Sequence, residues 1–159
     1  MPRVMIAAPG SGSGKTMITC GLLELLRRAG RPISFKCGPD YIDPMFHRFV
    51  LDIPSRNLDT FFTAPDRTRS LMGKACMKEG ADLAVIEGVM GYYDGLGGVS
   101  VRGSSYELSV QTGTPVILVV NGRGMSLSIA ALIQGFMVMY SDQMIRGVIL
   151  NRVSKGVCE

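Results

Sequence analysis

Residues 8–16, APGSGSGKT, combine three glycines with a lysine and a threonine in an order suited to binding phosphate. They follow the apolar run 4–8, which is typical of a strand, and precede a stretch with helical periodicity. Such glycines let backbone N–H groups point at an anion, and the start of the helix presents a positive dipole to it. Lys15 then reaches the terminal phosphates of a nucleotide, and the hydroxyl of Thr16 binds Mg²⁺. Pro9 replaces the usual first glycine, but the order of elements is kept, so we predict a nucleoside triphosphate site.

A second polar group, residues 36–44 (KCGPDYIDP), comes at the end of the apolar run 32–37. Ligands bind at the carboxyl ends of the strands in an open α/β sheet. Lys36 is therefore expected beside the phosphates, and Asp40 or Asp43 beside the metal. The alternative is a capped turn, in which Asp43 caps a helix that begins with Pro44.

A third group, residues 87–95 (EGVMGYYDG), follows the expected strand 82–88. That strand delivers Glu87 to the same edge of the sheet, where Thr16, an aspartate and Glu87 suffice as oxygen ligands for Mg²⁺. The glycines beside Glu87 and Asp94 allow close approach of a bulky ligand. The alternative is an ordinary exit from a strand into a loop.

Two further candidates are weaker. Asp59, in the sequence NLD, is either an Asx turn or a secondary site residue. His47, the single histidine, has no obvious acidic partner in the sequence and is interpreted as a packed or solvated side chain rather than a general base. The four cysteines, among them Cys158, form no CxxC pair, so we expect reduced thiols and neither a disulfide nor a zinc framework.

Apolar runs alternate with amphipathic stretches along the chain, which predicts one α/β domain over residues 1–159 with a mostly parallel, Rossmann-like P-loop sheet flanked by helices. The expected strands are 4–8, 32–37, 82–88, 115–121 and 146–151. The expected helices are 15–29, one beginning at 43–44, 66–80, 106–112 and 126–140. Residues 88–105 are expected to form a loop. No helix follows the last strand, so we expect a domain truncated at its C-terminus, whose uncovered strand favours self-association as a homodimer.

The hydrophobic content and the charge of the chain exclude several classes of protein. Hydrophobic residues make up 47% and charged residues 19% of the chain, which excludes a disordered protein. The net charge of +4 comes from scattered basic residues, which favours a polyanionic small molecule over nucleic acid. We expect neither a membrane span nor a secretory signal, and hence a cytoplasmic protein.

The succession APGSGSGKT, KCGPDYIDPMFH, NLD, EGVMGYYDG and GMSLSIAALIQGF resembles the synthetase domain of the cobyrinate a,c-diamide synthases, from about residue 3 to residue 153. The resemblance implies ATP-dependent amidation of the a- and c-side-chain carboxylates of cobyrinic or hydrogenobyrinic acid, in cobalamin biosynthesis. It implies an acyl phosphate that ammonia displaces, with ATP and Mg²⁺ as cofactors and a corrinoid as substrate.

The resemblance also implies roles for individual residues. The implied nucleotide-binding residues are Gly12, Ser13, Gly14, Lys15, Thr16 and Asn151. The implied metal ligands are Thr16, Asp43 and Glu87. The implied catalytic residues are Lys15, Lys36, Asp40 and Asp94, with Tyr41 and Asp94 on the side of the corrinoid.

One departure from the family is clear. Its members carry a C-terminal glutaminase domain with a Cys–His pair; we expect no such pair in these residues, and hence ammonia that is free or comes from a separate partner. Three alternatives stay open: a diamide synthase for nickel sirohydrochlorin, a dethiobiotin-type carboxylase, and a non-catalytic switch ATPase of the partition type. The motifs GPDYIDP and GYYDG disfavour the carboxylase. Gly10 disfavours the switch, because those ATPases place a second lysine there.

Overall fold

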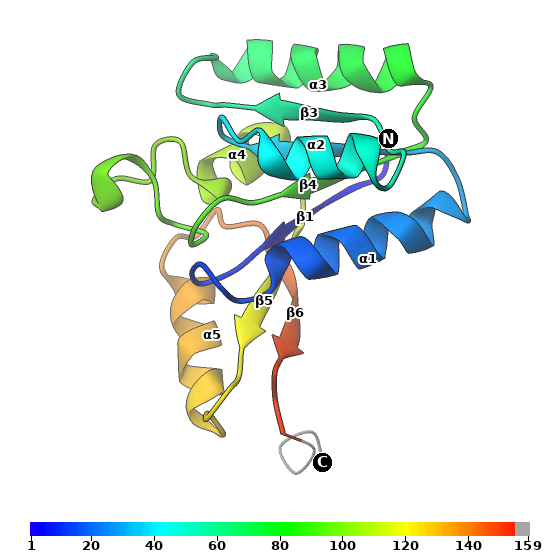
Figure 1. Ribbon diagram of the computed structural model, residues 1–159. Coiled ribbons are helices and arrows are strands. Elements are labelled where there is room, and N and C mark those ends of the chain that lie inside the picture. Colours follow the sequence, from blue (N-terminus) through cyan, green and yellow to red (C-terminus); the bar gives the residue numbers. More distant parts are fainter. Residues whose placement is uncertain (155–159) are drawn as a thin grey trace.

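The computed structural model describes residues 1–154, which contain a six-stranded parallel sheet in the order β3-β2-β4-β1-β5-β6 (Figure 1). The strands are β1 (Arg3–Ala7), β2 (Pro32–Cys37), β3 (Ser55–Leu58), β4 (Leu83–Glu87), β5 (Val116–Asn121) and β6 (Ile145–Asn151). The helices are α1 (Lys15–Arg27), α2 (Ile42–Phe49), α3 (Pro65–Glu79), α4 (Ser105–Thr112) and α5 (Ser128–Val138), with a short 3₁₀ turn η1 (Leu96–Gly98). The predicted α/β fold is confirmed.

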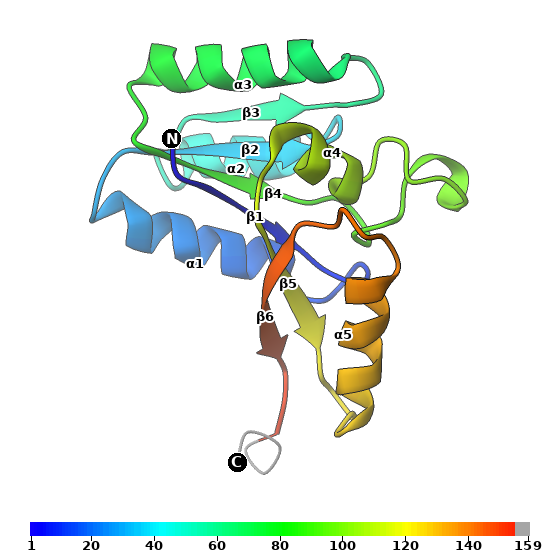
Figure 2. The ribbon, with the colours of Figure 1, turned by 180° about the vertical axis from the view of Figure 1, so that it is seen from behind.

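The helices cover the sheet in two layers. α1 and α2 lie on one face, while α3, α4 and α5 lie on the other (Figures 1 and 2). This division follows from right-handed crossovers, because the chain moves outward from β1 to β3 and then returns through β4 to β6. The connections that leave β1 and β4 therefore diverge to opposite faces. A crevice opens at such a point, beyond the carboxyl ends of the two strands.

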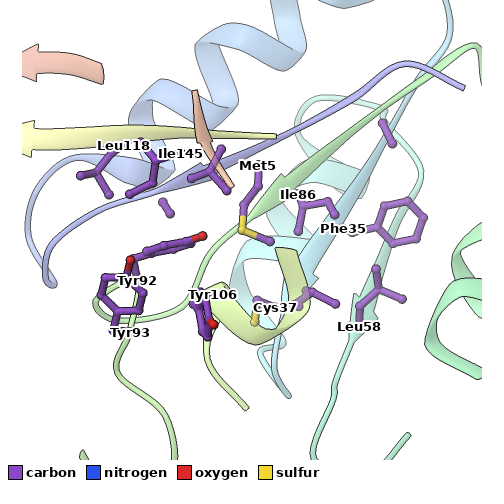
Figure 3. Close-up of a cluster of buried hydrophobic side chains, with 14 of the residues drawn as sticks. Met5, Phe35, Cys37, Leu58, Ile86, Tyr92, Tyr93, Tyr106, Leu118 and Ile145 are labelled. Atoms are coloured by element: carbon purple, nitrogen blue, oxygen red, sulfur yellow. The ribbon is translucent and has the colours of Figure 1, made fainter. Parts of the chain in front are cut away.

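The central strands are apolar on both faces, as their sequences predict. Met5 and Ala7 of β1 belong to the cluster under α3, α4 and α5, whereas Ile6 and Ala8 belong to the cluster under α1. Figure 3 shows the first cluster running along the sheet from Leu118 and Ile145 to Phe35 and Leu58. Burial on both faces makes β1 a rigid base for the loop that follows it.

Tyrosines of the EGVMGYYDG segment anchor the loop after β4 in this core (Figure 3). Tyr92 is fully buried and its hydroxyl lies 2.9 Å from Ser109 Oγ. The hydroxyl of Tyr93 donates to the carbonyl of Phe136 at 2.7 Å. These contacts tie the loop to α4 and α5, so both tyrosines have a structural role.

Two local features differ from expectation. The strand β3 was not expected, because its sequence SRNL is short and polar; it lies at the edge of the sheet and pairs only with β2. The helix α2 begins at Ile42 with Tyr41 at its N-cap, so Asp43 lies in its first turn instead of capping it; Asp40 Oδ1 accepts the backbone N–H of Ile42 at 2.9 Å. Asp59 forms the Asx turn, since its Oδ1 accepts the N–H of Phe61 at 2.8 Å.

Other expectations concern the surface and the thiols. No helix among the described residues is long and apolar enough to cross a membrane. Cys20, Cys37 and Cys76 are free thiols, and Cys158 lies outside the described residues. β6 pairs only with β5 and forms the second edge of the sheet, which is the edge expected to favour self-association.

Candidate nucleotide-binding site

The loop between β1 and α1 has the shape of an anion-binding nest. Gly12 and Gly14 have φ angles of +75° and +98°, which residues other than glycine rarely adopt. The hydroxyl of Ser13 donates to the carbonyl of Gly10 at 3.0 Å and closes the turn. Asn151, at the end of β6, supports the loop from outside, because its Nδ2 donates to the carbonyl of Ser13 at 2.9 Å. A Cβ on Gly14 would lie 2.4 Å from that nitrogen and would displace the amide of Asn151, and the φ of +98° itself favours glycine.

Lys15 is folded into this nest. Its Nζ donates to the carbonyl of Met90 at 2.6 Å and to that of Gly10 at 3.3 Å. Burial, together with repulsion from Lys36, lowers the pKa of Lys15. Met90 holds a φ of +44°, an uncommon backbone conformation for a residue with a side chain. Strain of this kind is typical of sites where a backbone carbonyl must point at a functional group.

Four polar side chains meet beside the nest. They come from the start of α1, from β2, from α2 and from β4. Lys36 on β2 and Glu87 on β4 are direct partners in the register of the sheet, so both side chains emerge at the same edge. Thr16 Oγ1 donates to Glu87 Oε1 at 2.6 Å, and Lys36 Nζ donates to the same oxygen at 3.1 Å. Lys36 Nζ also donates to Asp43 Oδ2 at 2.5 Å. The predicted metal and phosphate residues are therefore assembled in one place.

Burial and charge oppose one another within this cluster. Burial favours a neutral Lys36, but the carboxylates of Glu87 and Asp43 outweigh it and raise the pKa of Lys36. Burial raises the pKa of Glu87, although Lys36 and the hydroxyl of Thr16 favour its charged form. Lys36 thus stays positively charged inside the site, held by two carboxylates.

These residues fit a magnesium ion bound to a nucleotide. Thr16 and Glu87 present hard oxygen donors in direct contact with each other, and Asp43 joins them through Lys36. Glu87 Oε2 is buried with no hydrogen-bond partner among the described residues. Mg²⁺ is held by one or two carboxylates plus phosphate oxygens rather than by a cage of protein ligands. Such a cage of three or more His, Cys, Asp or Glu side chains is absent from residues 1–154.

The remaining predicted residues surround this cluster. Asp40 Oδ2 lies 3.8 Å from Lys36 Nζ. Tyr41 is 77% exposed and stands just before α2. Asp94 is exposed in the loop after β4, where its Oδ2 accepts the N–H of Gly91 at 3.0 Å. Asp94 does not line the phosphate pocket, so its predicted catalytic and substrate roles rest on its place in the loop.

Sequence reasoning missed Arg152 and the acidic neighbour of His47. Arg152 lines the same pocket of about 360 Å³ as Lys15, Thr16 and Lys36, and the one available signal was its position after Asn151. His47 is fully buried, with Nδ1 2.8 Å from Ser34 Oγ and Nε2 3.7 Å from Glu87 Oε2. The expectation of a packed histidine is correct, but its acidic neighbour comes from a strand 40 positions away. Burial lowers the pKa of His47 and favours the neutral ring.

Comparisons with known proteins identify the family of the chain. The profile of the family "CobQ/CobB/MinD/ParA nucleotide binding domain" matches residues 4–157. A cobyrinate a,c-diamide synthase of Priestia megaterium is 44% identical over 95% of this chain and 33% of its own length. A hydrogenobyrinate a,c-diamide synthase of Mycobacterium bovis is 46% identical over 96% of this chain and 34% of its own length. The chain thus spans about a third of the length of these relatives.

Solved structures share the fold at low sequence identity. The signal recognition particle receptor FtsY of Elizabethkingia anophelis has a TM-score of 0.63 at 11% identity, over 94% of this chain and 49% of its own. The MinC:MinD cell division complex of Aquifex aeolicus has a TM-score of 0.55 at 13% identity, over 97% and 70%. The predicted triphosphate loop, its assembled lysines and the matching profile lead to one assignment. The chain belongs to the CobQ/CobB/MinD/ParA nucleotide binding domain family and binds a nucleotide.

Proposed function

We propose that the chain is the single ATP-binding synthetase domain of a cobyrinate or hydrogenobyrinate a,c-diamide synthase. The relatives with 44% and 46% identity carry these names, and they support a corrinoid carboxylate as the substrate. The observation that carries the proposal is that two buried lysines, Lys15 after β1 and Lys36 on β2, line one pocket. One lysine suffices to bind the phosphates of a nucleotide. The second, Lys36, is held by Glu87 and Asp43 and can stabilise negative charge on the transferred phosphoryl group.

The chemistry proceeds in two displacements. A carboxylate oxygen of the corrinoid attacks the γ-phosphorus of ATP; the new O–P bond forms as the bond to ADP breaks, and ADP leaves. Ammonia then attacks the acyl carbon, forms the C–N bond and releases inorganic phosphate with the electron pair of the broken C–O bond. The proton lost by nitrogen passes to solvent. The expected product is a primary amide at each of the two side chains.

The residues of the chain act through position and charge. The N–H groups of the nest and Lys15 bind the phosphates, and Lys15 exchanges the carbonyls of Met90 and Gly10 for phosphate oxygens. Lys36 balances the charge that grows on the transferred group. Thr16, Glu87 and Asp43 would hold Mg²⁺, which neutralises phosphate charge when bound. Glu87 and Asp43 also keep Lys36 in place.

Ammonia reaches this site from solution or from a glutaminase outside the chain, and ATP-dependent synthesis of this kind fits a cytoplasmic protein. A switch ATPase would instead hydrolyse ATP in response to a protein partner. Gly10, where such switches have lysine, argues against that class. The two classes therefore differ in what their ATP turnover requires.

The test is to incubate the chain with ATP, Mg²⁺, cobyrinic acid and ammonium chloride, and to follow amide formation by mass spectrometry. We expect amide product only when all components are present. Lys15→Ala should lower the rate by about 10²–10³-fold, the scale for removing one preorganised charge-stabilising group. Lys74→Ala, on the exposed side of α3, is the matched control and should behave as the unchanged chain. ATP turnover that ignores cobyrinic acid and ammonia would contradict the proposal.

A further inference from the structure

An apolar hollow of about 390 Å³ lies next to the phosphate pocket. We call it the apolar pocket; its walls come from the loops after β2, β3 and β4. Val89 and Met90 line both the apolar pocket and the phosphate pocket, so the two spaces share a wall. Met90 is also the residue whose carbonyl holds Lys15. Whatever occupies the apolar pocket therefore lies beside the phosphate-binding lysine.

The walls of the apolar pocket expose large apolar side chains. Phe61, Phe62, Met90 and Leu96 are 48%, 74%, 46% and 41% exposed. The rings of Phe61 and Phe62 meet edge to face with centroids 4.9 Å apart. Exposed apolar groups gathered in a hollow indicate a binding site, and aromatic walls favour a flat conjugated ligand.

Hydrogen bonds and one close backbone approach hold the walls of the apolar pocket in place. Glu107 of α4 joins its two walls, because Glu107 Oε2 accepts both the hydroxyl of Thr60 at 2.6 Å and the backbone N–H of Gly103 at 2.7 Å. Within the loop after β4, Leu96 N–H donates to the carbonyl of Arg102 at 2.9 Å. A Cβ on Gly95 would lie 2.2 Å from that carbonyl oxygen, so this close approach requires glycine.

Arg102 supplies a positive charge to the apolar pocket. Arg102 lines the pocket and is exposed, and within residues 1–154 its guanidinium makes no hydrogen bond or ion pair. A free guanidinium beside apolar walls suits a carboxylate, which it binds with two parallel hydrogen bonds. The apolar pocket therefore combines the two properties needed to hold a flat ring with acidic side chains.

We propose that the apolar pocket binds one face of the tetrapyrrole substrate, with Arg102 on one of its carboxylates while another is presented to Lys15 and Lys36. This inference rests on the proposed function and names where its substrate lies. Phe61, Phe62 and Leu96 contact the ring, and Arg102 selects a polycarboxylate over an uncharged macrocycle. None of these residues lines the phosphate pocket, so substrate and nucleotide binding should be separable by mutation.

The test measures binding of cobyrinic acid and, separately, of ATP with Mg²⁺ by isothermal titration calorimetry. Arg102→Gln and Phe62→Ser should each weaken cobyrinic acid binding by about 10-fold or more, the order expected when a charged hydrogen-bond pair or a large apolar contact is lost. ATP binding should not change. The controls are Arg67→Gln and Phe49→Ser, two exposed side chains outside the apolar pocket, which should leave both affinities unchanged.

The methyl ester of cobyrinic acid distinguishes the contribution of the carboxylate charge to binding from that of the ring. It should bind equally to the unchanged chain and to Arg102→Gln, because it offers no carboxylate to the guanidinium. Unchanged cobyrinic acid binding in both pocket variants would overturn the inference and leave the proposed function standing. Failure of the unchanged chain to bind cobyrinic acid, with ATP binding retained, would instead contradict the proposed function, and the inference with it.

Discussion

His47 Nε2 and Glu87 Oε2 face each other at 3.7 Å, and both atoms are buried without a hydrogen-bond partner in the described part of the chain. On its other side the ring meets Ser34 Oγ at 2.8 Å. Glu87 is thus approached from two directions, by Thr16 and Lys36 at one oxygen and by His47 at the other. The ring and the hydroxyl of Thr16 together leave Glu87 little freedom to rotate.

His47→Leu tests whether the ring positions Glu87. Leucine fills similar space but leaves Ser34 Oγ and Glu87 Oε2 against hydrocarbon, so the free energy of unfolding should fall by about 1–3 kcal/mol. The Mg²⁺ concentration for half-maximal ATP turnover should also rise. Urea unfolding and a Mg²⁺ titration measure the two effects. His47→Gln keeps a nitrogen donor and should restore much of the Mg²⁺ response; a leucine variant that titrates like the unchanged chain would refute the positioning role.

Glu87→Gln tests the metal assignment directly. The change keeps the shape and the contact with Thr16 but removes the negative charge. The Mg²⁺ requirement should rise by about 10-fold or more, since even groups one step removed from a metal contribute about that much. Glu79→Gln is the control, because Glu79 pairs with Arg56 at 2.8 Å, outside the phosphate pocket. An unchanged Mg²⁺ titration would move the metal ligand elsewhere.

Gly91→Ala tests the contact between the loop after β4 and the phosphate loop. Its Cβ would lie 2.3 Å from Asp94 Oδ2 and 2.5 Å from the carbonyl oxygen of Pro9, a backbone atom that cannot yield cheaply. We expect a loss of about 1–3 kcal/mol in stability and weaker ATP binding. Gly73→Ala, inside α3, meets nothing within 4 Å and should instead stabilise the chain by about 0.5–1 kcal/mol. We expect the thermal unfolding temperature to fall in Gly91→Ala and to rise in Gly73→Ala. Equal shifts of this temperature in the two variants would contradict the prediction.

The thiol of Cys37 should resist alkylation in alkaline solution. Burial raises the pKa of Cys37 to about 12, and burial also raises that of the half-buried Cys20 to about 11. The thiolate is the reactive form, so a raised pKa keeps the thiol protonated and unreactive to a higher pH than the usual value near 8.5. Iodoacetamide at pH 9, followed by peptide mass spectrometry, should leave Cys37 unmodified in the folded chain and modify it in urea. Equal labelling in both conditions would show that Cys37 is not buried.

Several features were predictable because their signals are local. Gly12, Gly14 and Lys15 form a nest whose geometry depends on neighbouring residues. Lys36 and Glu87 were predicted at one edge of the sheet because each lies at the carboxyl end of a strand; their pairing in register depends on the strand order. The strand β3 was missed, since SRNL has too few apolar residues to show a strand pattern and is stabilised by pairing with β2.

The phosphate loop, the α/β class and the edge of the sheet at which the polar groups gather could all be predicted from the amino-acid sequence. These follow from backbone freedom at glycine, from apolar periodicity and from the common direction of parallel strands. Three contacts became visible only in the folded chain: His47 lies beside Glu87, Asn151 supports Ser13, and Arg102 lines the apolar pocket. Those contacts join residues far apart in the chain, and they depend on strand order and side-chain packing, which no local pattern encodes.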